Sequence, residues 1–404
     1  MKYLIVVPDG AADEKIESLG GKTPLQVANL SYINGLAAVG QVGLVKTIPT
    51  GIAPGSDAAN LSVMGYDPGV YLTGRSPLEA ASIGIEMADT DVAFRTNLVT
   101  LSGDGEYDDL TIMDHSSGDI STEEADELIK TVNQAFASER IRFYTGVSYR
   151  HCMIVQNGST DDTLTPPHDV LGKRAGDNLP KGEGAGFITE MMKKSYAILK
   201  DHPVNIARVQ NGLNPANSLW IWGQGKKPAL SSFYEKYGIT GAVISAVDLI
   251  KGIGICAGLS SIDVPGATGT LHTNYEGKAN AAIQAFKDGK DFVYVHMEGP
   301  DECAHQGDLS GKIKSLELID QKLVKPVIEY LKGSGDNFRV LIVPDHRTPM
   351  CIRTHSADPV PFVVYDSRKK EAVDESRRFS EESGESGMFF ESGFALADYF
   401  FEKA

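Results

Sequence analysis

Short apolar runs near both ends of the chain predict buried β-strands. Residues 3–7 (YLIVV) form one, and others lie within 291–298 (DFVYVHME), 338–345 (FRVLIVPD) and 360–366 (VPFVVYD). The segment 310–333 has apolar residues at helical spacing and ends in glycine, which predicts an amphipathic helix between two of these strands. Because a strand, a helix and a strand follow one another, we expect a mostly parallel sheet with helices on its faces.

Two more helices are predicted before the middle of the chain. Residues 23–39 form one helical pattern, with Thr23 as N-cap and Pro24 in the first helical position, where proline is favoured. A second helix is expected within residues 55–66, beginning after a glycine-rich loop.

The pattern changes between about residue 89 and about residue 214. Short alternating strands, as in 92–101 and 143–155, are mixed with helical patches at 121–136 and 184–203, and loops rich in Gly, Asp and Pro divide them. We therefore predict an α+β domain over residues 89–214, inserted into an α/β core that comprises residues 1–88 and 215–404.

Amino-acid composition and net charge exclude several classes of protein. The chain is 42% hydrophobic and 23% charged, as expected of a globular protein, and its net charge of −16 argues against broad binding to nucleic acid or anionic membranes. The four cysteines show no C-x-x-C spacing, which favours reduced thiols and a cytoplasmic protein. The longest apolar stretch contains Asp248 and Lys251, and the N-terminal apolar run is too short for a secretory leader, so no membrane segment is expected.

Metal-type side chains gather where the predicted strands end. Three of the aspartates each follow an apolar run, and in open parallel sheets ligands bind beyond the carboxyl ends of strands. Two of the histidines stand one and four residues after an aspartate, and the third precedes two prolines that stiffen its loop. The six residues are Asp9, Asp301, His305, Asp345, His346 and His355.

Each of these residues alone has an ordinary interpretation. Asp9 suits a helix cap, and His305 suits a surface or core histidine. Their common placement at strand ends favours one shared site. Three Asp and three His suit Mn²⁺, Zn²⁺ or a similar ion. Because six ligands exceed what one tetrahedral ion needs, we expect two ions about 4 Å apart, an arrangement that clamps both oxygens of a phosphoryl displacement.

Ser56 follows Gly55 at a predicted helix start and has two interpretations. It can be an N-cap whose side chain accepts a hydrogen bond from a first-turn amide. It can also be a nucleophile, activated by a neighbouring ion and facing a phosphate at a helix N-terminus. The small residues around it, including Gly51 and Ala58, would let a phosphate approach the backbone.

Other motifs are weak. The segment GIGICA matches a dinucleotide fingerprint by its letters, but no clear strand precedes it, and no P-loop, kinase or G-x-S-x-G motif occurs. Residues 165–174 carry His168, Lys173 and Arg174, which fit either a substrate-binding loop or a solvated charged loop.

The motifs together resemble one known family. VPDGAAD, GSDAAN, FRTN, EGPDECAH, PDHRTP and THSADPVPF are similar to segments of the archaeal-type, cofactor-independent phosphoglycerate mutases of the alkaline phosphatase superfamily, and the likeness runs nearly end to end. The resemblance implies an alkaline phosphatase-like core with an inserted cap domain, a small phosphorylated metabolite as substrate, and two divalent ions. Mn²⁺ is the first expectation, and Zn²⁺, Mg²⁺ or Co²⁺ are also suitable.

The resemblance also implies roles for single residues. It places Asp9, Ser56, Asp345 and His346 around one ion and Asp301, His305 and His355 around the other. Ser56 would take the phosphoryl group and return it to a second hydroxyl of the same substrate. Lys251 would help to hold the phosphate. Arg95 would face the substrate. Independently of the resemblance, two chain crossings join the core to the inserted domain, so we expect this domain to act as a lid that brings Arg95, Arg150 and His151 toward the substrate.

One departure from the family opens an alternative substrate. Residues 113–120 (MDHSSGDI) stand where the archaeal mutases tend to carry arginines, so His115 and Asp119 take part in the substrate prediction. A mutase needs cations for the glycerate carboxylate, whereas a homoserine kinase of the same superfamily needs an acid for an ammonium group. The hypotheses are therefore a mutase, a homoserine kinase-like phosphotransferase, or a binding protein with a decayed site.

Overall fold

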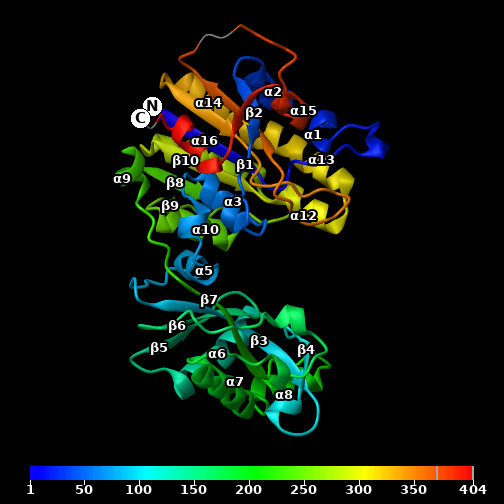
Figure 1. Cartoon of the computed structure of the whole chain (residues 1–404), viewed down its shortest axis with the longest axis vertical. Helices are drawn as coiled ribbons and strands as arrows, with labels where there is room; N and C mark the ends of the chain where they lie inside the picture. The colour runs from blue at the N-terminus through cyan, green and yellow to red at the C-terminus, as the bar shows by residue number, and fades with distance from the viewer. Residues whose placement is uncertain (370–371, 403–404) are drawn as a thin grey trace. The chain divides into compact units, whose positions relative to one another are not determined.

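The computed structural model describes residues 1–369 and 372–402 and divides the chain into two compact units (Figure 1). We call Met1–Leu72 with Ala229–Ala404 the core unit, and Thr73–Pro228 the inserted unit. No helix among the described residues combines the length and the apolarity that crossing a membrane requires. The predicted fold class, an α/β core with a mostly parallel sheet and an inserted α+β unit, is confirmed.

The inserted unit is longer at both ends than the predicted range 89–214. Helix α5 (Ser76–Ser82) packs against strands β3 and β7 of this unit. Strand β7 (Ser218–Lys226) pairs along most of β3 (Val92–Ser102). Both flanking segments therefore bury their apolar side chains in the inserted unit, and the boundaries move to residues 73 and 228.

The core unit is built on one eight-stranded sheet with the order β13-β2-β12-β11-β1-β10-β8-β9. Central strand β1 is parallel to both of its neighbours, β10 and β11, whereas β12 is antiparallel to β11 and to β2. The strands are β1 (Lys2–Pro8), β2 (Gln41–Val45), β8 (Gly241–Ile244), β9 (Ser260–Ser261), β10 (Phe292–Met297), β11 (Phe338–Ile342), β12 (Val360–Asp366) and β13 (Met388–Phe390).

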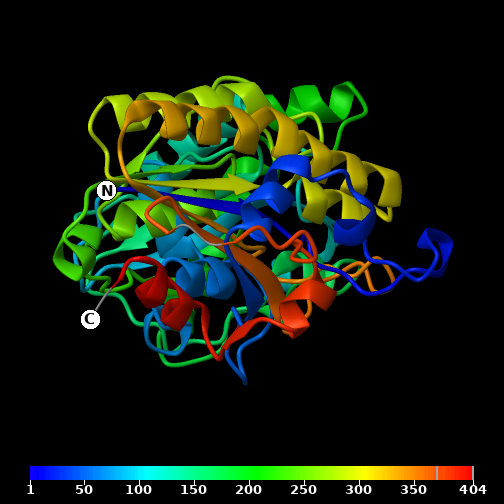
Figure 2. The ribbon, with the colours of Figure 1, turned by 90° about the horizontal axis from the view of Figure 1, so that it is seen from above.

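Helices cover both faces of this sheet, with α14 (Lys325–Ser334) on one side and α3 (Ser56–Val63) and α16 (Gly393–Phe400) on the other (Figures 1 and 2). The predicted helix over 310–333 is realised as α13, a π-helical turn η5 and α14 in succession. The helices of the core unit are η1 (Glu17–Leu19), α1 (Pro24–Val27), α2 (Ser31–Ala38), α3 (Ser56–Val63), α4 (Pro68–Tyr71), α9 (Phe233–Tyr237), α10 (Asp248–Cys256), α11 (Tyr275–Lys287), α12 (Gly299–Gln306), α13 (Leu309–Leu318), η5 (Ile319–Val324), α14 (Lys325–Ser334), α15 (Glu381–Glu385) and α16 (Gly393–Phe400).

The segment 23–39 forms two helices, so the prediction of a single helix is wrong. Helix α1 begins as predicted, with Thr23 as N-cap, but Ala28 is extended and α2 starts again after it. The carboxylate of Asp320 accepts a hydrogen bond from the backbone N–H of Ile33 at 2.8 Å, which satisfies a first-turn amide of α2. This partner lies 287 positions along the chain, so local sequence does not reveal the break.

The inserted unit is a five-stranded antiparallel sheet with helices around it. Its longest strand, β3, pairs with β4, β6 and β7, and its core contains Phe94, Leu128, Met192 and Trp220. Its remaining elements are η2 (Tyr107–Asp109), β4 (Thr111–Asp114), α6 (Thr122–Phe136), β5 (Ile141–Tyr144), β6 (Arg150–Val155), η3 (Pro167–Val170), η4 (Gly176–Asn178), α7 (Ala185–Leu199) and α8 (Pro203–Gln210).

A buried ion pair fastens α13 to the loop after β1, and it gives the first prediction. Lys312 Nζ lies 2.6 Å from Asp13 Oδ2, and the side chains are 0% and 1% exposed. Lys312→Met should lower the free energy of unfolding by about 3–5 kcal/mol, because it leaves a buried carboxylate without its cation. Chemical denaturation measures the change. Lys332→Met, at an exposed position of α14, is the matched control and should change little. Equal stability of the two variants would contradict the prediction.

Candidate metal centre

The sheet brings the three predicted aspartates to one edge. Asp9 follows β1, Asp345 follows β11, and Asp301 lies in the first turn of α12, just after β10. Since β1 is parallel to both β10 and β11, the carboxyl ends of the three strands meet at the same edge. Parallel pairing therefore collects residues that are far apart in the sequence.

One ligand cluster surrounds the imidazole of His346. Its Nε2 lies 3.3 Å from Asp345 Oδ2, 3.5 Å from Asp9 Oδ1 and 3.1 Å from Ser56 Oγ. The ligand atoms of Asp9, Asp345 and His346 all lie within 4.8 Å of one another. The structure thus brings together the four residues that the family resemblance assigned to one ion.

A second ligand cluster adjoins the first. His305 Nε2 lies 3.1 Å from Asp301 Oδ2 and 3.0 Å from His355 Nε2. The ligand atoms of Asp301 and His355 also lie within 4.8 Å of one in His346, so His346 stands between the two clusters. The three residues assigned to the other ion are therefore also together, and they share a neighbour with the first set.

Hydrogen bonds orient the histidines so that Nε2 faces the clusters. His305 Nδ1 donates to the backbone carbonyl of Arg353 at 2.9 Å. The Thr348 hydroxyl donates to Asp301, so it accepts from His346 Nδ1 at 3.2 Å. In each ring the hydrogen on Nδ1 is used, which leaves a lone pair on Nε2 for an ion.

Gly10 makes the close approach of the aspartates possible. Its φ of +62° is a conformation that side chains disfavour, and a Cβ there would lie 2.5 Å from Asp301 Oδ1. Its N–H donates to Asp345 Oδ1 at 3.1 Å. The Pro-Asp-Gly sequence at the end of β1 therefore positions one aspartate and anchors another.

The clusters carry more buried negative charge than their surroundings balance. Asp9, Asp345 and His346 are at most 1% exposed, and Asp301 is 6% exposed. Burial, followed by the negative charges of Asp345 and Asp301, raises the pKa of Asp9 well above its ordinary value. Among the described residues, Asp9 Oδ1 has no hydrogen-bond partner. Buried carboxylates and imidazoles with an orphaned oxygen fit divalent cations, and neither cluster contains a cysteine.

Ser56 is not the helix cap that its simpler interpretation required. The N-cap of α3 is Gly55, no side chain caps the helix, and Ser56 is its first residue. Its hydroxyl instead contacts His346 at the cluster. A serine whose hydroxyl faces metal-type ligands is available for chemistry.

Asn60 and Tyr294 support this serine, and the sequence did not indicate either. Asn60 Nδ2 donates to the backbone carbonyl of Ser56 at 2.8 Å and to Asp345 Oδ2 at 2.9 Å. The Tyr294 hydroxyl donates to Asn60 Oδ1, and burial raises the pKa of Tyr294, so it stays protonated. The first turn of α3 is therefore tied to a cluster carboxylate.

His296 is a further residue that sequence reasoning missed. Its Nε2 lies 3.0 Å from Asp9 Oδ2, and burial lowers its pKa to about 4, so the ring is neutral. His296 pairs in register with Val7 of β1, near the strand end that carries Asp9. The sequence feature that could have revealed His296 is a single histidine inside an otherwise apolar strand.

Lys251 makes its contacts outside the two clusters. It lies on α10, and its Nζ is 2.8 Å from Asp263 Oδ1 and 3.9 Å from Asp248 Oδ1. The described structure gives it no hydrogen bond or ion pair with a cluster residue. No contact among the described residues therefore supports the predicted role of Lys251 in holding phosphate.

In the inserted unit, four predicted substrate residues join a chain of ring contacts. The Arg95 guanidinium lies 4.6 Å from the Trp222 ring. The His168 ring is 5.4 Å from Trp222 and 6.2 Å from His115. We call the whole chain the cationic array; its members are Arg95, Trp222, His168, His115, Tyr149 and Arg150.

Three other predicted substrate residues do not take part in this array. His151 is 5% exposed, its Nδ1 accepts from the N–H of Gly146, and burial lowers its pKa to about 3. Asp119 is exposed, with a φ of 50°. Lys173 Nζ donates to the backbone carbonyl of Asp169 at 3.2 Å. A buried, neutral His151 differs from the expectation that it faces substrate.

Comparison with known proteins places the chain among named relatives. The profile of the 2,3-bisphosphoglycerate-independent phosphoglycerate mutase family matches residues 37–205. The chain is 48% identical to the enzyme of that name from Methanosarcina acetivorans over 390 residues, 96% of each chain. It is 46% identical to the probable enzyme of that name from Geobacter sulfurreducens over 403 residues, 100% of each chain.

Solved structures share the whole fold. The cofactor-independent phosphoglycerate mutase from Thermoplasma acidophilum is 29% identical, with a TM-score of 0.70, and the match covers 100% of this chain and 99% of that one. A protein from Pyrococcus horikoshii is 28% identical, with a TM-score of 0.81, over 99% and 96% of the two chains.

Proposed function

Because the chain belongs to the family of 2,3-bisphosphoglycerate-independent phosphoglycerate mutases, we propose that it interconverts 3-phosphoglycerate and 2-phosphoglycerate through a phosphoserine at Ser56. The observation that carries the proposal is the contact of Ser56 Oγ with His346 Nε2 at 3.1 Å, made by a serine that caps no helix. We place the reaction in the cytoplasm and assign two divalent ions, Mn²⁺ first, to the two ligand clusters.

The chemistry proceeds in two displacements at phosphorus. Ser56 Oγ attacks the phosphorus of 3-phosphoglycerate, and the bond from phosphorus to the C3 oxygen breaks. The C2 hydroxyl of the glycerate then attacks the phosphoserine, and the bond to Ser56 Oγ breaks. When bound, the ions supply positive charge that favours the deprotonated serine and neutralises the phosphate.

The chain's own residues hold the reacting groups. Asn60 fixes the start of α3 against Asp345, so Ser56 is oriented before substrate arrives. We assign the glycerate carboxylate to Arg95 and Arg150 of the cationic array, because guanidinium groups bind carboxylates in a bidentate way. Lys251 and the imidazoles of the array are the further groups that we assign to substrate.

The homoserine kinase alternative is not favoured, because the relatives carry the mutase name. The segment 113–120 lacks the family's arginines, yet His115 lies within the cationic array. Asp119, the acid that an ammonium group would need, has no ring contact with that array. The cations of the array are Arg95, which pairs with Glu79 at 2.9 Å, and Arg150, and their guanidinium groups suit an anionic substrate.

Detection of phosphate on Ser56 tests the proposal. Protein loaded with Mn²⁺ is mixed with 3-phosphoglycerate, quenched in acid and digested, and the peptide containing Ser56 is analysed by mass spectrometry. We expect phosphate on Ser56 alone, and formation of 2-phosphoglycerate. Phosphate on another residue, or transfer from a nucleotide to homoserine with no mutase activity, would overturn the proposal.

Loss of the Arg95 guanidinium should weaken substrate use. Arg95→Ala should lower kcat/KM roughly 10- to 100-fold, because hydrogen bonds to charged groups contribute about 1.5–3 kcal/mol. Bound metal, measured by elemental analysis, should stay unchanged. Arg142→Ala, at an exposed arginine of β5, is the matched control. If both variants keep normal kcat/KM, Arg95 does not contact substrate.

A further inference from the structure

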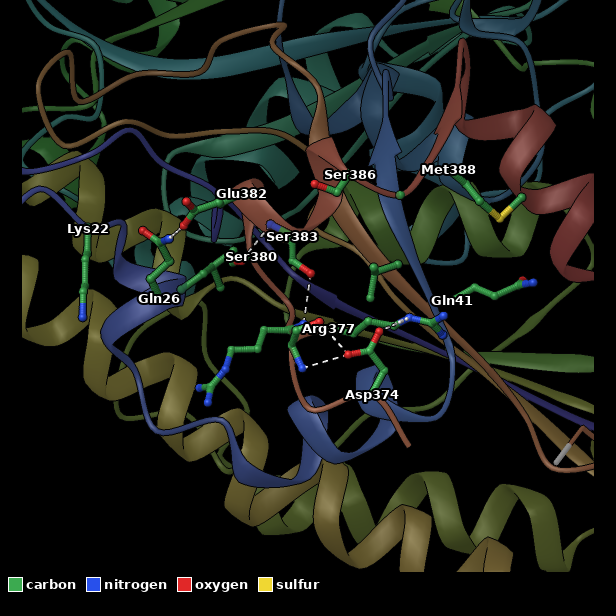
Figure 3. Close-up of a pocket in the computed structure, with 15 residues that line it drawn as sticks. Lys22, Gln26, Gln41, Asp374, Arg377, Ser380, Glu382, Ser383, Ser386 and Met388 are labelled. Atoms are coloured by element: carbon green, nitrogen blue, oxygen red, sulfur yellow. Dashed lines mark hydrogen bonds and ion pairs between the residues drawn. The ribbon is translucent and has the colours of Figure 1, made fainter. Parts of the chain in front are cut away.

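A cavity in the core unit lies outside both ligand clusters (Figure 3). Its volume is about 980 Å³, at the upper end of the range for small-molecule pockets. Three separate segments line it: residues 22–26, residues 41–42 and residues 374–388. We call it the donor cavity, for the surplus of hydrogen-bond donors described next.

Two cations of the donor cavity form no ion pair with any described residue. Lys22, Arg377 and Arg378 all line it. Arg377 is engaged, since it donates to the backbone carbonyl of Gly40 at 2.7 Å and pairs with Asp374 at 3.3 Å. Lys22 and Arg378 are exposed, and their side chains make neither an ion pair nor a hydrogen bond with any other described residue. On a chain of net charge −16 such cations are notable.

Serine hydroxyls add donors to the same cavity (Figure 3). Ser380 Oγ accepts from the N–H of Ser383 at 3.3 Å, and Ser383 Oγ accepts from the N–H of Arg378 at 3.0 Å. Neither O–H finds an acceptor among the described residues, and Ser386 makes no side-chain hydrogen bond there. The hydroxyl hydrogens are therefore available to a ligand.

Two carboxylates also line the cavity, and each has a hydrogen-bonding partner. The Glu382 carboxylate accepts from Gln26, and Asp374 accepts from Ser376 and pairs with Arg377. Three cations (Lys22, Arg377 and Arg378) therefore face two carboxylates (Asp374 and Glu382), and the lining is positively charged and rich in hydroxyl donors. A phosphate group is anionic and carries several acceptor oxygens, so it complements this lining. The volume leaves room for more than a free phosphate ion.

We propose that the donor cavity binds a small phosphate-bearing metabolite, and that its occupancy changes the divalent-ion affinity of the ligand clusters. The second half rests on the proposed metal site, whereas the first half does not. A buried chain of hydrogen bonds connects the donor cavity to the ligand clusters. It begins at Thr23 and Glu381, which are adjacent in the sequence to Lys22 and Glu382.

The first links join both walls of the cavity. Glu381 Oε2 accepts from the hydroxyl of Thr23 at 2.7 Å, and Glu381 Oε1 accepts from the N–H of Asp13 at 2.9 Å. Glu381 is 6% exposed and Thr23 is 3% exposed. A ligand that shifts Lys22 or the segment 374–388 therefore also shifts the hydrogen bonds of Glu381.

The remaining links reach the clusters. Asp13 pairs with Lys312 at 2.6 Å, and Lys312 Nζ donates to the backbone carbonyl of Thr348 at 2.9 Å. The hydroxyl of Thr348 contacts both Asp301 and His346. Each of these residues is buried, so the hydrogen bonds lie in a medium of low dielectric constant. In such a medium a change in the position of one partner alters the strength of the next hydrogen bond.

Binding is tested on the full chain after removal of metal. Without ions the clustered carboxylates repel anions, so calorimetric titration with inorganic phosphate, and separately with a nucleoside monophosphate, reports other sites. The wild type should bind, and Lys22→Gln/Arg378→Gln should bind about tenfold more weakly or worse, because two charge-assisted contacts are lost. Arg142→Gln is the matched control and should bind as the wild type does.

The outcomes of this titration are distinct. Tighter binding of the nucleoside monophosphate than of phosphate would identify a larger metabolite as the occupant, and equal binding would identify the phosphate group as the part recognised; both support the anion site. No binding by the wild type, or equal affinity in the double variant, would overturn it. Failure of Mn²⁺ binding would affect the proposed function and not this result.

Coupling is tested by titrating Mn²⁺ with and without saturating phosphate. The Mn²⁺ dissociation constant of the wild type should change by about twofold or more, and that of the double variant should not. An unchanged constant in the wild type would overturn the coupling. So would an equal change in the double variant, because phosphate would then be acting at the ions themselves.

Discussion

Replacing Ser56 with alanine should abolish phosphoryl transfer and leave the fold intact. Without the hydroxyl no phosphoserine can form, so kcat should fall by roughly 10⁴-fold or more. Stability should hardly change, because Ser56 is not the N-cap and its side chain satisfies no helix amide. A coupled assay for 2-phosphoglycerate measures the rate, and thermal unfolding measures the fold.

Ser62→Ala provides the matched control on the same helix. Ser62 is buried in α3, and its Oγ has no hydrogen-bond partner among the described residues. Its loss should therefore leave kcat near the wild-type value. A Ser56→Ala protein that keeps more than about a tenth of the activity would show that another group carries the phosphate.

The change Asp9→Asn should weaken metal binding without weakening the metal-free fold. Asp9 Oδ1 has no hydrogen-bond partner among the described residues, so an amide there breaks no donated bond. The change removes a buried charge that Asp345 and Asp301 repel, and stability without metal should stay equal or rise. The Mn²⁺ dissociation constant should rise roughly 100-fold or more, since a ligand is lost.

Asp320→Asn is the contrasting variant. Its carboxylate also is buried, but it accepts from backbone amides of α2 and lies in neither ligand cluster. Stability should fall by about 1–3 kcal/mol, because an amide cannot accept at both oxygens, while Mn²⁺ affinity should stay the same. Elemental analysis and metal titration compare the two variants. If Asp9→Asn binds Mn²⁺ normally, Asp9 is not a ligand.

Several features of the site followed from sequence alone, for a physical reason. Asp9, Asp301 and Asp345 each stand just past an apolar run, and parallel strands present such positions at one edge. Their convergence could therefore be predicted without coordinates. His296 lies inside β10 rather than past its end, and a single histidine within an apolar strand resembles an ordinary core residue, so this reasoning did not reveal it.

Other features were beyond local sequence because their partners are distant. The break between α1 and α2 depends on Asp320, and the alignment of α3 depends on Asn60 and Tyr294. The boundary of the inserted unit depends on the pairing of β7 with β3, which periodicity does not specify. In each case a long-range hydrogen bond, rather than propensity, selects the conformation.

The sequence by itself determined the α/β class, the candidate ligands at the strand ends and the candidate nucleophile, because periodicity and turn residues are local properties of a chain. Only the tertiary structure decided that Ser56 faces His346 and caps nothing, that His346 stands between two clusters, and that His151 is buried. It alone also joined Glu381 to Asp13 across 368 positions. Such contacts form only when distant segments pack together, and their geometry is a property of packing rather than of any single segment.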